Sequence, residues 1–188
     1  GVDGLPGPKS SLHSRTGGAA RQPGATRDRS EPDIDDAEIA IGNEAVAYLY
    51  GLIRGPAAPS RARTPEESIT IGRHRMARMR RFLDRLGNPH DALRVVHVGG
   101  TSGKGSVAAS VAEGLVAAGY RTGLHCTPYL QTPLEKLQID GRLARPGELA
   151  ELTAWARPHV DSAARDDPDG APTYGMVWVS LTFEYFRR

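Results

Sequence analysis

The chain has 188 residues, of which 39% are hydrophobic and 24% charged, and its formal net charge is +2. This length fits one domain or part of a larger one, and the balanced charge gives no reason to expect nucleic-acid binding. No apolar run approaches the ~18 residues that span a bilayer. The single cysteine, Cys126, excludes an internal disulfide and fits a reducing compartment. We therefore expect a cytoplasmic monomer whose partners are neither nucleic acid nor membrane.

The N-terminal stretch, residues 1–33, carries much of the chain's glycine and proline and almost no aliphatic side chains. A stretch of this composition buries too little apolar surface to offset the entropy lost on ordering. The composition therefore predicts a disordered tail over residues 1–33, followed by a folded part over residues 34–188.

Two helices are predicted at the start of the folded part. The first begins near Asp35 or Asp36, because acidic residues favour the positive end of the helix dipole, and its apolar face is assigned to Ile39, Ile41, Ala45, Tyr48 and Leu52. The second runs from Pro65 or Gly72 to Leu86, with apolar residues at helical spacing. Its other face carries arginines, which we interpret as a solvated face rather than a phosphate-binding patch: Arg73, Arg75, Arg78, Arg80, Arg81 and Arg85.

The middle of the chain predicts a strand, a glycine loop, a helix and a second strand. Residues 94–98 (RVVHV) form a short β-branched run that is typical of a buried parallel strand. Glycines follow, then a buried helix that ends at Gly119, then a strand over residues 121–126. This order predicts a right-handed βαβ unit. The fold class is therefore expected to be α/β, with a P-loop-type parallel sheet and flanking helices.

The last third of the chain predicts a hairpin and two helices. Residues 137–143 alternate in polarity around an Asp-Gly pair, which is a hairpin signal. A surface helix is predicted over residues 146–164, a loop over residues 166–172, and an apolar helix from Tyr174 to Phe186.

The segment Gly99–Ser106 (GGTSGKGS) lies between the predicted strand and helix, which is the context that a phosphate-binding loop requires. Glycines allow successive backbone N–H groups to point into one concavity, and the following helix adds its positive end. Lys104 can neutralise the β- and γ-phosphates of a nucleotide, and a nearby hydroxyl can reach Mg²⁺. The match to G-x-x-x-x-G-K-[ST] is imperfect, because Val98 replaces the first glycine and Gly105 follows the lysine. An ordinary glycine turn is therefore the alternative.

Five segments, taken in order, extend the pattern beyond the loop: LGNPH at 86–90, VVHVGGTSGKGSVAA at 95–109, AGYRTGL at 118–124, CTPYL at 126–130 and EKLQIDG at 135–141. Together they resemble the folylpolyglutamate synthases and dihydrofolate synthases of the Mur ligase superfamily. The phosphate loop of that family reads HVAGTNGKGS, with the same glycine after the lysine. The resemblance covers about residues 44–188.

This resemblance implies part of the ATP-binding domain of a ligase that adds glutamate to a folate-like carboxylate. ATP phosphorylates the carboxylate, and the amine of glutamate then attacks the acyl phosphate. The implied cofactors are ATP and Mg²⁺, and the other small-molecule partners are the folate-like acid and glutamate. The resemblance makes Lys104 the catalytic residue and assigns the nucleotide to Gly100, Thr101, Ser102, Gly103, Lys104, Gly105 and Ser106.

The implied Mg²⁺ ligands are Ser106 and Thr127, and Thr127 stands at the serine of the family's S-S-P-H-L segment. The histidine of that segment is replaced by Tyr129. A second metal carboxylate of the family falls on Met176 in an ungapped comparison, and a thioether is a poor Mg²⁺ ligand. A rival comparison with a deletion makes Glu184 the ligand; we prefer the ungapped one, in which Glu184 is an exposed helix residue.

Two alternatives stay open. One is another Mur-type ligase with a different acid or amino acid, and the other is a catalytically inactive nucleotide-binding module that lost the metal carboxylate. The resemblance further implies that the glutamate-binding domain of such a ligase lies beyond Arg188. This stretch alone is therefore not expected to complete the reaction.

Overall fold

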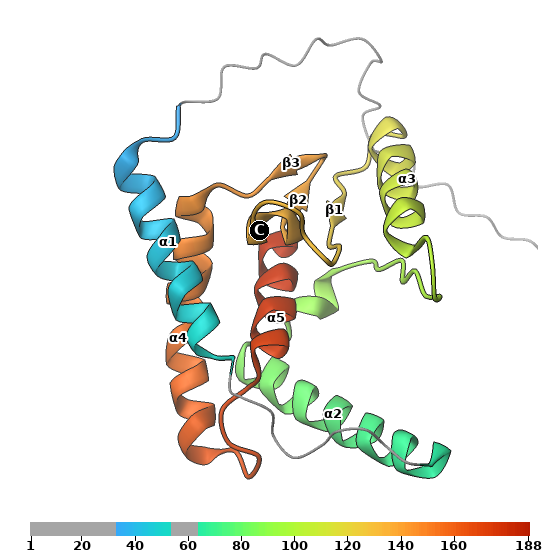
Figure 1. Ribbon diagram of the computed structural model, residues 1–188, viewed down its shortest axis with the longest axis vertical. Helices are drawn as coiled ribbons and strands as arrows, with labels where there is room; N and C mark the ends of the chain where they lie inside the picture. Colours follow the sequence, from blue (N-terminus) through green and yellow to red (C-terminus); the bar gives the residue numbers. More distant parts are fainter. Residues whose placement is uncertain (1–32, 54–63) are drawn as a thin grey trace, which may run out of the picture. The chain divides into compact units, whose positions relative to one another are not determined.

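This computed structural model describes residues 33–53 and 64–188, and the tail predicted over residues 1–33 lies outside these ranges except for Asp33. Helix α1 (Asp36–Gly51) lies along α4 (Pro146–Asp166), and α5 (Tyr174–Arg187) packs against α4 (Figure 1). Helix α2 (Pro65–Arg85) contacts both α4 and α5. The side chains that these helices bury together include Leu49, Phe82, Leu149, Leu152, Val177 and Leu181.

The predicted starts of both early helices are confirmed, and local capping explains them. The Oδ1 atom of Asp35 accepts a hydrogen bond from the Glu38 N–H at 2.7 Å, and the Oγ1 atom of Thr64 accepts one from the Glu67 N–H at 3.2 Å. Each bond satisfies an N–H group that a helix start leaves without an intrahelical partner. Pro65 at the first helical position adds its fixed φ.

The apolar face predicted for α1 is partly wrong. Ala45 is buried as expected, but Ile39 and Ile41 are 43% and 46% exposed. The helix instead buries Gly42 and Leu49 together with Ala45. A Cβ at Gly42 would clash with the Cβ of Pro146, so α4 approaches this face of α1 too closely for a larger residue.

The sheet of the described residues is small and antiparallel. Its strands lie in the order β1 (Gly123–Leu124), β2 (Gln138–Ile139) and β3 (Arg142–Leu143). Gly123 pairs with Ile139, and Gln138 pairs with Leu143. The predicted hairpin is confirmed, because Asp140 and Gly141 connect β2 to β3 with φ values of 53° and 77°. Positive φ at both turn residues is the conformation that an Asp-Gly pair favours.

Among the described residues the predicted parallel sheet does not form. Residues 94–98 form no strand, and Val95 and Val96 are 66% and 65% exposed. The expected second strand, 121–126, is reduced to β1, and its ladder partner is the hairpin rather than residues 94–98. A β-branched run favours an extended backbone, but a strand also needs a neighbour that takes its hydrogen bonds. The coarser class, helices combined with a sheet, is confirmed.

Helix α3 (Lys104–Ala117) follows the glycine loop as predicted, and it contacts β1 (Figure 1). It is not the buried helix that was expected, because none of its residues is buried. Val107 is 52% exposed and Val111 is 37% exposed. The position of the helix was thus correct, and the expected burial of its face was wrong.

The C-terminal helices and short turns complete the described part. The predicted helices correspond to α4 and α5, and α4 contributes a buried face to the core. Short 3₁₀ turns lie at η1 (Pro89–Ala92), which packs on α5, and at η2 (Pro133–Lys136), which precedes the hairpin. Within residues 33–53 and 64–188, no helix combines the length and the apolarity that crossing a bilayer requires.

The arginines of α2 divide into two groups, which corrects the expected solvated face. Arg73, Arg75 and Arg80 are exposed. The other three bind the end of α4 and the loop that follows it: Arg78 donates to the carbonyl oxygens of Asp169 and Ala171, Arg81 to the carboxylates of Asp167 and Asp169, and Arg85 to Ser162. The second group therefore attaches α2 to the rest of the fold.

Candidate nucleotide-binding site

The glycine loop bends sharply before α3. Gly100 has a φ of +136° and Gly103 a φ of +72°, and Gly103 is the residue that caps the start of α3. Residues with side chains rarely adopt such positive φ values. The N–H groups in the first turn of a helix lack intrahelical partners, and this end carries partial positive charge. The loop therefore presents backbone donors where an anion would be stabilised.

Lys104 lies over its own loop. Its Nζ atom donates to the carbonyl oxygen of Gly100 at 2.7 Å and lies 3.4 Å from that of Thr101. All seven residues assigned to the nucleotide, Gly100 through Ser106, are exposed. The structure thus brings together the predicted lysine, the glycines and the helix start, and it leaves them accessible to a ligand. An incoming phosphate oxygen could replace the carbonyl oxygens as the partner of the ammonium group.

Thr127 lies in the loop that follows β1, the strand that α3 contacts. Its side chain is exposed, as is that of Ser106. No hydrogen bond joins these two hydroxyl groups within the described ranges. Hydroxyl oxygens are hard donors that suit Mg²⁺, which also takes phosphate oxygens and waters. Both residues thus offer exposed oxygen atoms of the type that Mg²⁺ accepts.

The part of the chain that the structure describes holds no cluster of protein ligands for a metal ion. Across residues 33–53 and 64–188, no three His, Cys, Asp or Glu side chains gather where they could hold a metal ion. Met176 is partly buried and lines a small cleft beside Arg78 and Phe82 of α2. Its side chain therefore takes part in packing between helices.

Glu184 is buried, which contradicts the expected exposed position. Its carboxylate is 3% exposed and accepts hydrogen bonds from Arg187 and Arg188, at 2.9 Å in each case. These two guanidinium groups lower the pKa of Glu184, against the effect of its burial, which alone would raise it. A carboxylate engaged in this way has little capacity left for a metal ion.

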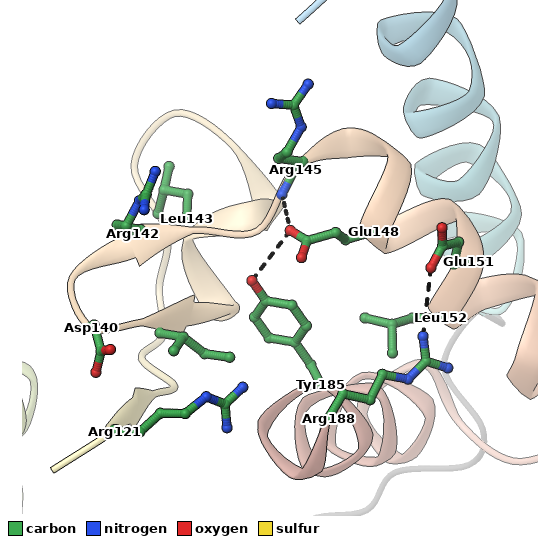
Figure 2. A pocket seen from close by; sticks show the side chains of 11 residues that line it. Arg121, Asp140, Arg142, Leu143, Arg145, Glu148, Glu151, Leu152, Tyr185 and Arg188 are labelled. Atoms are coloured by element: carbon green, nitrogen blue, oxygen red, sulfur yellow. Dashed lines mark hydrogen bonds and ion pairs between the residues drawn. The ribbon is translucent and has the colours of Figure 1, made fainter. Parts of the chain in front are cut away.

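A separate cavity of about 490 Å³ lies between the hairpin, α4 and α5 (Figure 2). Its lining carries both acidic and basic side chains, and some of the lining residues contact one another. The Tyr185 hydroxyl donates to Glu148 at 3.3 Å, and Arg188 lies 3.7 Å from Glu151. The Glu148 carboxylate and burial together raise the pKa of Tyr185 to about 12. None of the residues predicted for the nucleotide or the metal lines this cavity.

Lys136 and three aromatic residues form a group that the sequence did not predict. The ammonium group of Lys136 is enclosed by the rings of Tyr129, Tyr174 and Trp178. Its members are brought together by the fold, because Tyr174 and Trp178 of α5 are distant in the sequence from Tyr129 and Lys136.

Known proteins resemble this chain in sequence and in structure. The chain is 33% identical over 111 residues to a dihydrofolate synthase/folylpolyglutamate synthase of Bacillus subtilis, a match that covers 59% of this chain and 26% of the relative. A folylpolyglutamate synthase structure from Thermotoga maritima superposes with a TM-score of 0.64 and 26% identity, covering 80% of this chain and 31% of that chain. A Mycobacterium tuberculosis folylpolyglutamate synthase complexed with ADP gives a TM-score of 0.62 and 26% identity, over 80% of this chain and 30% of that chain.

These likenesses support a fold that combines helices with a sheet, and the similar proteins are folylpolyglutamate synthases. Over the matched stretch the chain is homologous to folylpolyglutamate synthases and dihydrofolate synthases, and it corresponds to part of each relative. It spans about a quarter of the length of the Bacillus relative, since the match covers 26% of that protein. A scan of protein-family models gives no match.

Proposed function

We propose that residues 34–188 form an ATP-binding part of a ligase that joins glutamate to a folate-like carboxylate. The observation that carries the proposal is the exposed glycine loop at the start of α3, with Lys104 lying over it. The family relationship supports the ligase class, and the bound ADP of the Mycobacterium relative supports a nucleotide as the ligand. In the proposed reaction ATP phosphorylates the carboxylate and ADP is released; the amine of glutamate then attacks the acyl phosphate, and the amide forms with loss of a proton and inorganic phosphate.

In this proposal some residues neutralise the charge of the phosphates, and others hold the ligands in position. The N–H groups at the start of α3 would bind phosphate oxygens, and the Lys104 ammonium would neutralise the charge that moves with the transferred phosphoryl group. Ser106 and Thr127 would hold Mg²⁺ through their hydroxyl oxygens. The metal, when bound, supplies Lewis-acid polarisation of the phosphate oxygens. Phosphoryl transfer needs such positioning more than it needs a covalent protein group.

The test is the affinity of this chain for ATP, measured by calorimetry with and without Mg²⁺. Lys104→Ala should weaken binding by about 10-fold to 100-fold, because a charge-assisted hydrogen bond contributes roughly 1.5–3 kcal/mol. Ser110→Ala, an exposed change on the same helix, is the matched control and should leave affinity unchanged. If Lys104→Ala binds ATP as tightly as the wild type, the phosphate assignment is wrong.

A nucleotide-binding module without ligase activity is the second candidate. The observation that favours it is the absence of a carboxylate cluster among the described residues, with Met176 packed against α2 and Glu184 bound by two arginines. Such a module would bind ATP equally well with and without Mg²⁺. A ligase part should bind ATP more tightly when Mg²⁺ is present, so the same titration separates the two.

A further inference from the structure

Lys136 ends the turn η2 and is almost completely buried, with 5% of its surface exposed. Its Nζ atom lies 4.3 Å from the ring centroid of Trp178, 4.8 Å from that of Tyr174 and 5.0 Å from that of Tyr129. It also donates a hydrogen bond to the Tyr174 hydroxyl at 2.9 Å. The ammonium group is thus enclosed by three aromatic rings.

The rings take the place of a counter-ion. No carboxylate forms an ion pair with Lys136 among the residues that the structure describes, and a buried charge without compensation is costly. The negative faces of aromatic rings attract a cation, and the attraction grows when water is excluded. Burial lowers the pKa of Lys136, which agrees with an ammonium group that depends on these rings.

The three rings belong to segments that Lys136 holds together. Tyr174 and Trp178 lie in the first turns of α5, whereas Tyr129 lies in the loop after β1, two residues beyond Thr127. The hydroxyl groups of Tyr129 and Tyr50 are 2.6 Å apart, so the same loop reaches the end of α1. The position of Tyr129 is therefore set by contacts with η2 and with α1.

The neighbouring residue, Glu135, fixes the backbone of the same loop. Its carboxylate accepts hydrogen bonds from the N–H groups of Leu130, Gln131 and Thr132, at 2.8, 2.7 and 3.0 Å. Two consecutive residues of η2 thus hold one loop, with Glu135 on its main chain and Lys136 on the ring of Tyr129. This arrangement restrains both ends of the segment from Tyr129 to Thr132.

We propose that Lys136 is a positioning residue, which fixes the ring of Tyr129 and through it the loop that carries the Thr127 hydroxyl. The part of this inference that concerns Mg²⁺ rests on the proposed function, because Thr127 is assigned to the metal there. The part that concerns the loop rests on the contacts of Lys136 alone. Amide hydrogen exchange tests the effect on the loop, and ATP affinity with and without Mg²⁺ tests the effect on the metal.

The first measurement is amide hydrogen exchange at Leu130 and Gln131, because exchange reports local opening of the loop. Lys136→Met removes the charge and keeps an unbranched apolar chain. It should accelerate exchange at these amides by about 3-fold to 30-fold, the range that cation–π energies imply. Lys136→Arg is the matched control, because it keeps a cation that can lie over the rings and should leave exchange within about threefold of the wild type. Unchanged exchange in Lys136→Met would overturn the proposal.

The second measurement is the Mg²⁺-dependent gain in ATP affinity. Lys136→Met should reduce this gain several-fold and leave Mg²⁺-free ATP binding unchanged, a pattern that a general loss of structure would not give. If the wild type itself shows no gain with Mg²⁺, the proposed function fails, and the exchange measurement still decides the role of Lys136. If Lys136→Met does not fold, Tyr129→Leu replaces it; this variant removes the ring and should accelerate exchange equally, and unchanged exchange would again overturn the proposal.

Discussion

Arg81 donates hydrogen bonds to both carboxylate oxygens of Asp167, from Nε at 3.0 Å and from Nη2 at 3.1 Å. This bidentate pair joins α2 to the residue that follows α4, and Arg81 also contacts Asp169. The Asp167 side chain is 6% exposed. The pair therefore attaches a long helix to the core through a carboxylate that is withdrawn from water.

The pair predicts how stability depends on pH. The Arg81 hydrogen bonds lower the pKa of Asp167 from 3.8 to about 2, so the folded state favours the ionised carboxylate. The contribution of Asp167 to stability is then fully present above the unfolded pKa and is lost as the pH falls through the folded pKa. We expect Asp167→Asn to lower the melting temperature at neutral pH, and the melting temperatures of variant and wild type to converge near pH 2.

Thermal melts followed by circular dichroism at a series of pH values check this prediction. Asp84→Asn, an exposed change on α2, should alter the melting temperature little at any pH. A constant difference between Asp167→Asn and the wild type from pH 7 down to pH 2 would contradict the ion-pair account.

We expect truncation of Leu181, which lies in the core, to lower the free energy of unfolding strongly. Its side chain is completely buried among α1, α4 and α5, with 0% exposed. Leu181→Ala should lower the free energy of unfolding by about 2–5 kcal/mol, because it removes buried contacts and leaves a cavity. Ile69→Ala, at a side chain that is 56% exposed, should change it by less than about 0.5 kcal/mol. Denaturant titration measures both, and equal effects would show that α5 does not form the core.

Local sequence signals predicted the elements well where the determinants are themselves local. The Asp140–Gly141 pair predicted the hairpin because aspartate and glycine tolerate the positive φ values of the turn. The acidic and proline signals at Asp35 and Pro65 predicted two helix starts, because capping involves only the neighbouring residues. The glycine loop before α3 was located in the same way.

Contacts between distant segments were not predictable from the same signals. Residues 94–98 have the composition of a strand, but a ladder depends on a neighbour that composition does not specify. The sequence does not distinguish the arginines of α2 from one another, yet only Arg78, Arg81 and Arg85 contact the end of α4 or the loop after it. Tyr129 was noted only as a replacement for histidine, and its contact with Lys136 depends on where three segments meet.

We expect the Thr127 hydroxyl to contribute to the gain in ATP affinity that Mg²⁺ gives. Thr127→Val keeps the size of the side chain and removes the hydroxyl oxygen, so it should abolish most of the gain in ATP affinity that Mg²⁺ gives. Thr127→Ser keeps the hydroxyl and should retain the gain. Calorimetric titration of ATP at several Mg²⁺ concentrations compares the two variants, and a Val variant that responds to Mg²⁺ like the wild type would remove Thr127 from the metal site.

The most direct test of the central claim is a nuclear magnetic resonance titration of this chain with ATP and Mg²⁺. If the loop at the start of α3 binds the phosphates, the amide resonances of Gly100, Gly103 and Gly105 should shift together and saturate at one affinity. The amide of Gly141 in the hairpin turn should not move. Shifts confined to other segments, with the three loop glycines unchanged at saturating ATP, would contradict the account.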